Sequence, residues 1–124
     1  TEESCEVTVP YKWINKNPFK STFWAVLGMA AEMNGAALLL QYTKGQSPSI
    51  STYPVTCEAE FVKKATDITT FTCNDGLMVK EKVIEAMKSG QGITFETVMN
   101  GLNRNGELIC KFKFLWSIKR RSKS

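Results

Sequence analysis

One long apolar segment constrains the fold of this chain more than any other feature. It runs from Ser21 to Tyr42, is apolar on every face of a helix, and carries a single carboxylate, Glu32, near its middle. An ionised side chain in apolar surroundings costs several kcal/mol unless it is paired, hydrated or protonated. A site that needs a tuned acid or base is one reason to keep such a group. Glu32 is therefore the first candidate catalytic residue.

The same segment is compatible with two structural roles that involve no catalysis. A structural glutamate, partly hydrated at a helix seam or a subunit contact, produces the same pattern. A membrane-spanning helix is the second, since Phe23 to Leu40 is nearly long enough and contains no Lys or Arg. Glu32 and Asn34 oppose insertion, because a central acidic residue costs roughly 2.5 to 3.5 kcal/mol. A buried helix in a globular domain fits better, and we expect no membrane span.

The composition is that of a globular protein. Of the 124 residues, 43% are hydrophobic and 23% are charged, which predicts a single domain over residues 1–124. The first ten residues are acidic and polar, unlike a secretory signal, so we expect a cytoplasmic protein. Four cysteines stand singly and are expected to be reduced core thiols. They are Cys5, Cys57, Cys73 and Cys110.

The chain has no histidine. This excludes Ser-His-Asp triads, Cys-His pairs and His-ligated zinc. Any acid–base chemistry must then use carboxylates, Lys, Tyr or Cys. We expect neither a metal nor a resident cofactor.

The net charge of +4 owes much to a basic tail at residues 119–124. The simplest interpretation of this tail is a solvated segment. A phosphate-rich ligand such as coenzyme A could instead use Lys119, Arg120, or the pair Lys63 and Lys64. Aromatic residues are not interleaved with these cations, so we do not expect nucleic-acid binding.

The periodicity of the chain predicts an α+β domain. Apolar alternation predicts strands over residues 5–10, 55–62 and 66–73, and helical spacing predicts a small amphipathic helix from Val79 to Lys88. Ser21 or Thr22 is expected to cap the long helix. Two further alternating runs flank Asn103–Gly106, which predicts a hairpin whose Asn-Gly supplies positive-φ turn residues. The apolar face of these strands needs a cover, and the long helix is the obvious one.

A long helix wrapped by a curved antiparallel sheet occurs in the hotdog, cystatin-like and nuclear-transport-factor-like folds. The segment NPFKSTFWAVLGMAAEMNGAA resembles the helix-entry motif of hotdog thioesterases of the phenylacetyl-CoA type, in which an Asn precedes a helix carboxylate by fifteen residues. Asn17 and Glu32 have this spacing. The hairpin NRNGELICKFKFLWSIKRR is similar to the closing hairpin of these proteins, and the extra small helix resembles a poorly characterised branch of the superfamily.

The resemblance implies hydrolysis of an acyl-CoA or acyl-carrier thioester by at least a homodimer, with the acyl site between subunits. Glu32 would be the base or the nucleophile, Asn17 would orient water or the carbonyl, and backbone N–H groups near Trp24 and Ala25 would stabilise the oxyanion. Coenzyme A would enter only as part of the substrate. Where the motif has Gly and then His-Gly-Gly, this chain has Lys20, Phe23, Trp24 and Ala25.

Two functions from different classes compete with this one. The first is a non-catalytic acyl or lipid carrier, in which the same tunnel holds a chain and Glu32 is structural. The second is an interaction module of the cystatin-like type. A hydroxyl used by related thioesterases one turn after the carboxylate would fall at Ala36, which cannot donate a hydrogen bond.

Overall fold

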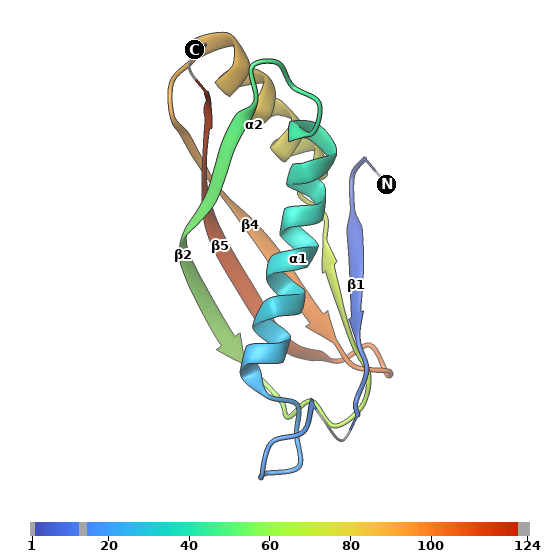
Figure 1. The fold of residues 1–124 in the computed structure, drawn as a ribbon. Coiled ribbons are helices and arrows are strands. Elements are labelled where there is room, and N and C mark those ends of the chain that lie inside the picture. Colours follow the sequence, from blue (N-terminus) through green and yellow to red (C-terminus); the bar gives the residue numbers. More distant parts are fainter. Residues whose placement is uncertain (1, 13–14, 122–124) are drawn as a thin grey trace.

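The computed structural model describes residues 2–12 and 15–121 of the chain. Within this part the chain is α+β, with two α-helices and a single five-stranded antiparallel sheet of order β1-β3-β4-β5-β2 (Figure 1). The elements are β1 (Cys5–Val9), α1 (Trp24–Thr43), β2 (Ile50–Phe61), β3 (Thr69–Cys73), α2 (Gly76–Ser89), β4 (Ile93–Leu102) and β5 (Leu108–Arg120).

The apolar side of the sheet forms the core with α1. The helix packs mainly over β1, β3 and β4, while α2 packs against α1, β4 and β5. Small residues let α1 approach the strands closely. A Cβ on Gly35 would meet the hydroxyl of Thr97 at 3.2 Å and the ring of Trp116 at 3.3 Å. The sheet side of the core is largely aromatic, because Phe71, Phe112, Phe114 and Trp116 are all buried.

Helix α1 has 20 residues and begins at Trp24, three residues later than the sequence predicts. The predicted cap is wrong: Phe23 is the N-cap and no side chain caps the helix. The Thr22 hydroxyl donates to the carbonyl of Ala65 at 3.2 Å, which ties the entry of the helix to the β2–β3 connection. Among the described residues, no helix is long and apolar enough to cross a membrane.

Strand β2 begins at Ile50, earlier than the sequence predicts, and lies at one edge of the sheet. The sequence did not predict this extension because it contains Pro54, and proline lacks the N–H that a central strand needs. At an edge this is tolerated, and the pairing with β5 shifts register between Pro54 and Thr56. The observed α2 is longer than predicted at both ends, and β3 is shorter at its start.

The predicted hairpin is confirmed, but its turn differs from the prediction, because Gly106 has a positive φ and Asn105 does not. β4 and β5 pair from Ile93 with Ile118 to Leu102 with Leu108, and Gly106 in the turn has φ +80°. Strand β5 continues through Arg120, so Lys119 and Arg120 are strand residues and not part of a tail. Residues 122–124 of the predicted tail lie outside the described residues.

The four cysteines are free thiols, as expected. Cys73 and Cys110 are buried, and burial raises the pKa of each to about 12. Cys5 is half-buried, and Cys57 is exposed, so the prediction of a core thiol is wrong for Cys57. Cys57 is exposed because it lies on β2, and α1 covers little of the inward side of this strand.

Candidate functional site

A cavity of about 370 Å³ lies where the start of α1 meets the end of β2. It combines an amide, two hydroxyls, two aromatic rings and two lysines. Four of the residues predicted for the site meet here: Asn17, Trp24, Lys63 and Lys64. The complete lining consists of Asn17, Ser21, Thr22, Trp24, Leu27, Phe61, Val62, Lys63, Lys64 and Ala65.

Asn17 organises the tight turn that leads into α1. Its Oδ1 accepts hydrogen bonds from the backbone N–H of Phe19 at 2.9 Å, the backbone N–H of Ser21 at 3.2 Å and the Ser21 hydroxyl at 3.2 Å. Two N–H donors aimed at one atom fix that atom as the oxygen of the amide. The Nδ2 group has no acceptor among the described residues. The amide of Asn17 is thus one of the polar groups that line the cavity.

The first turn of α1 offers two more donors. The N–H of Phe23 donates to the carbonyl of Asn15, and the N–H of Thr22 donates to that of Ala65. The N–H groups of Trp24 and Ala25 have no acceptor within the described chain, as is normal for the first residues of a helix. The positive end of the helix dipole adds to their pull on an anion.

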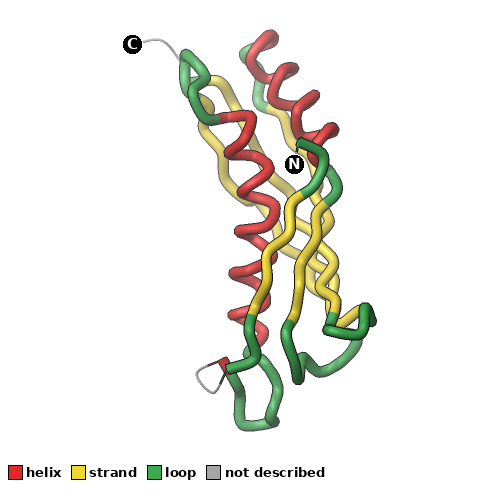
Figure 2. The backbone as a smooth tube through the Cα atoms, turned by 90° about the vertical axis from the view of Figure 1, so that its right-hand side faces the viewer, coloured by secondary structure: helices red, strands yellow, loops and turns green. Residues whose placement is uncertain are grey.

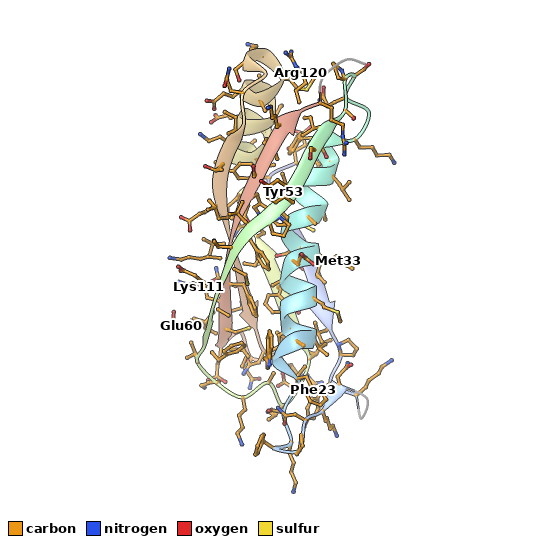
Figure 3. The ribbon with its side chains drawn as sticks, turned by 60° about the vertical axis from the view of Figure 1, so that its left-hand side comes forward. Phe23, Met33, Tyr53, Glu60, Lys111 and Arg120 are labelled. Atoms are coloured by element: carbon orange, nitrogen blue, oxygen red, sulfur yellow. The ribbon has the colours of Figure 1, made fainter. Side chains whose placement is uncertain are left out.

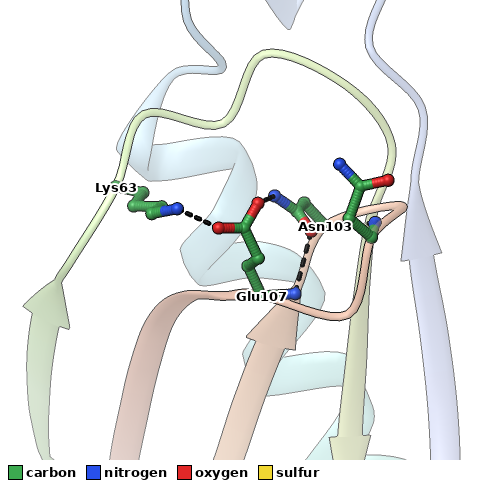
Figure 4. A network of polar contacts seen from close by, with 4 residues as sticks. Lys63, Asn103 and Glu107 are labelled. Atoms are coloured by element: carbon green, nitrogen blue, oxygen red, sulfur yellow. Dashed lines mark hydrogen bonds and ion pairs between the residues drawn. The ribbon is translucent and has the colours of Figure 1, made fainter.

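Lys63 and Lys64 differ in how far they are neutralised. Lys63 forms an ion pair with Glu107, whose other oxygen accepts a hydrogen bond from the Asn103 side chain (Figure 4). The hydrogen bond from Lys63 is the main reason that the pKa of Glu107 is lowered. Lys64 has no carboxylate partner among the described residues, and its Nζ donates to the carbonyl of Phe19 at 3.4 Å. Lys64 is the freer cation at this cavity.

Glu32 lies away from the cavity and is exposed, which corrects the expectation of a buried carboxylate. It is eight residues after Trp24, or about 12 Å further along the helix axis. Its helix face is shared with exposed apolar side chains, including Met33, which is 62% exposed and lies midway along α1 (Figure 3). Within one chain, Asn17 and Glu32 do not meet.

The negative charge of Glu32 acts on Cys57, which lies on the inward side of β2. Burial raises the pKa of the Cys57 thiol, and the negative charge of Glu32 raises it further. Cys57, Ala59 and Phe61 pair with inward-facing Phe114, Phe112 and Cys110, so they form one strip on the inward side of β2. This strip joins the cavity, at Phe61, to the neighbourhood of Glu32.

The structure does not bring Lys119 and Arg120 to this cavity. They lie at the opposite end of the molecule, where Figure 3 labels Arg120, while Phe23 marks the end with the cavity. The guanidinium of Arg120 donates to the carbonyl of Met87 at 2.8 Å and so satisfies the last turn of α2. Among residues 2–12 and 15–121, no group of three His, Cys, Asp or Glu side chains could hold a metal ion.

Six lining residues were not anticipated as parts of a site: Ser21, Thr22, Leu27, Phe61, Val62 and Ala65. Phe61 contacts the buried ring of Phe112 edge-on, with 5.8 Å between ring centroids. Ser21 is buried although it lies in a polar loop. The alternation around Phe61 indicated an inward side chain but not a cavity wall, and no local signal marks Ser21.

The fold is of the hotdog type found in solved thioesterases. A Pseudomonas aeruginosa protein of unknown function, described as a probable thioesterase, superposes with a TM-score of 0.82 at 18% identity over 96% of this chain and 78% of that one. A Chlorobaculum tepidum protein of unknown function gives 0.79 at 13% identity over 96% and 78%. A Haemophilus influenzae thioesterase gives 0.71 at 16% identity over 97% and 74%. No protein-family model matches the sequence, and no curated protein is significantly similar to it.

Proposed function

We propose that this chain is a thioester hydrolase acting on an acyl-CoA or an acyl-carrier thioester. The observation that carries the proposal is the cavity at the start of α1. Asn17, Trp24 and Lys64 line this cavity, and the N–H groups of Trp24 and of Ala25, which is outside the lining, have no acceptor within the described residues. Donors fixed before the reaction stabilise the oxyanion that forms when a thioester carbonyl is attacked. The likeness in fold to solved thioesterases supports the same class.

Glu32 would supply the base or the nucleophile. As a base, it takes a proton from water while the water oxygen bonds to the carbonyl carbon. The tetrahedral intermediate then expels the thiolate, which recovers that proton. As a nucleophile, the carboxylate forms an anhydride that water hydrolyses. Both routes release a carboxylic acid and a free thiol, and both need Glu32 near the carbonyl.

A second copy of the chain would close the distance between Glu32 and the cavity. The outer edge of β2 is unpaired over a twelve-residue strand, and the exposed face of α1 beside it is apolar. Edges and faces of this kind are normally covered. We propose a homodimer, or a higher homo-oligomer built from it, in which the open side of one copy covers the open side of the other. The open side consists of the edge and inward side of β2 together with the exposed face of α1. Light scattering at micromolar concentration should give the mass of two chains, and a monomer would remove the intersubunit site.

The decisive test is an acyl-CoA panel with detection of the released thiol. Glu32→Gln keeps the shape of the side chain and removes the base, so kcat should fall roughly 100-fold or more. Asn17→Ala should lower turnover less. Glu96→Gln is the matched control, because Glu96 is an exposed glutamate on the other face of the sheet. If Glu32→Gln remains as active as Glu96→Gln, the role assigned to Glu32 is wrong.

A non-catalytic acyl-binding protein is the second candidate. It is favoured by the bulky Trp24 at the cavity, which is 68% exposed, and by the distance of Glu32 from Asn17. Such a protein would bind acyl chains and release no thiol from any member of the panel. Direct binding of a fluorescent fatty acid, measured on the same samples, separates this function from hydrolysis.

A further inference from the structure

One end of the molecule carries an aromatic side chain on a rigid turn. The β1–α1 connection forms the extreme of this end, beside the β2–β3 connection and the β4–β5 turn (Figures 1 and 2). Phe19 lies in this connection and is 72% exposed. The turn is held by the bonds to Asn17 Oδ1, by a bridge between Lys16 and Thr22, and by the Tyr11 hydroxyl, which donates to the carbonyl of Lys20 at 2.8 Å.

The backbone of this turn is strained where the aromatic residue is presented. Lys20 has φ +62° and is the one non-glycine residue with positive φ in the described chain. Such a conformation costs free energy for any residue with a Cβ and persists only where the surroundings impose it. The turn therefore keeps the Phe19 ring exposed to water at a cost in free energy. The packing of a single chain does not explain this exposure.

Three lysines lie in the same connection as Phe19, and a fourth lies in the β2–β3 connection. Lys12, Lys16, Lys20 and Lys64 are exposed, and none forms an ion pair within the described residues. The Nζ of Lys16 lies 4.6 Å from the centre of the Tyr11 ring.

Both acidic groups among the connecting segments of this end are already engaged. Glu107 binds Lys63, and Asp67 accepts the backbone N–H of Arg104 at 3.2 Å. The end is therefore positive, with an apolar ring at its tip.

We propose that this end, defined by Phe19 with Lys12, Lys16 and Lys20, docks onto an anionic lipid bilayer. Aromatic rings partition to the boundary between headgroups and acyl chains, and lysines beside them are attracted to anionic headgroups. An acidic protein would satisfy the lysines but gives no role to a ring held out at the tip. The proposal stands apart from the hydrolase, because it needs neither Glu32 nor the cavity.

The test is sedimentation of the whole chain with vesicles at physiological ionic strength. Vesicles of phosphatidylcholine with about one third phosphatidylglycerol should bind the protein, and pure phosphatidylcholine should bind it far less. Replacing Lys12, Lys16 and Lys20 together by Gln should weaken binding about 100-fold, at about fivefold for each lysine. The charge-matched control replaces three exposed lysines elsewhere, Lys80, Lys88 and Lys113, and should retain most of the binding.

The ring is tested separately from the charge. Phe19→Ser should weaken vesicle binding roughly tenfold. Phe19→Trp should restore it, and Leu77→Ser, at an exposed apolar residue of α2, should leave it unchanged. Because Phe19 is exposed, equal thermal unfolding midpoints should show that each variant is folded. Three outcomes would overturn the proposal: no binding to anionic vesicles, equal binding to neutral ones, or equal losses in the target and control variants.

Discussion

Strands β4 and β2 flank the same strand, β5, in antiparallel register, yet their side chains have different environments. On β4 every second residue from Phe95 to Gly101 is buried. On β2 the residues from Thr52 to Phe61 are all exposed, although Cys57, Ala59 and Phe61 face the same side of the sheet as the core. The difference lies in the helix, because α1 covers β4 and leaves β2 open. Alternation in a sequence thus predicts which way a side chain faces, and the cover decides whether it is buried.

The largest expected effect is on stability, and it compares the buried ring of Phe112 with the ring of Phe61 that contacts it. Phe112 is buried and Phe61 is 51% exposed. Phe112→Ala should lower the free energy of unfolding by about 3 to 5 kcal/mol, because it empties part of the core. Phe61→Ala should cost only about 1 kcal/mol when measured at low protein concentration. Denaturant unfolding checks both values. A larger loss for Phe61→Ala at high concentration only would mean that a second copy buries the open side.

The next effect concerns that second copy. Met33 lies on the exposed face of α1, so Met33→Glu should leave the folded single chain intact. In the proposed dimer it would place a charge in an apolar interface and weaken association by about 100-fold. Sedimentation equilibrium should then show monomers at concentrations where the parent chain is dimeric. Lys80→Glu on α2 is the control for a charge change. A dimer that tolerates Met33→Glu does not use this face.

A smaller effect on stability is expected on the part of the sheet that α1 covers. The indole N–H of Trp116 donates to the Thr97 hydroxyl at 2.7 Å, and both residues are buried. Thr97→Val keeps the shape but leaves the N–H without an acceptor, which should cost about 1 to 2 kcal/mol of stability. Thr56→Val, on the open strand, should be nearly neutral. Equal thermal shifts in the two variants would contradict the contrast between the strands.

Local sequence signals predicted much of this fold. The β4–β5 hairpin follows from alternation around Asn103–Gly106, and α2 follows from the helical spacing of its apolar residues. The start of α1 could not be predicted, because the segment before the helix is positioned by bonds from Thr22 to Ala65, far away in the chain. The early start of β2 was hidden by Pro54, which only an edge strand accommodates.

The candidate site was predictable only in part, because its residues are brought together by contacts between segments that lie far apart in the sequence. Asn17, Trp24 and Lys64 meet because the entry to α1 and the end of β2 lie at one end of the sheet. Arg120 does not meet them, because β5 carries it to the other end. The exposure of Glu32 depends on which strands lie under α1, and no local pattern contains that information.

The last and smallest effect uses the cysteines to measure the open side directly. Thiolate, not thiol, reacts with alkylating reagents, so the rate at a given pH rises as the pKa of the thiol falls. Cys57 should react in the folded protein, whereas the buried Cys73 and Cys110, with pKa values of about 12, should react only after unfolding. The charge of Glu32 raises the pKa of Cys57, so Glu32→Gln should lower that pKa and speed alkylation at neutral pH. Mass spectrometry of the alkylated peptides measures this rate, with Glu96→Gln as control. An unchanged rate in Glu32→Gln would mean that its carboxylate does not face β2. Protection of Cys57 that grows with protein concentration would instead place the second copy over this strand.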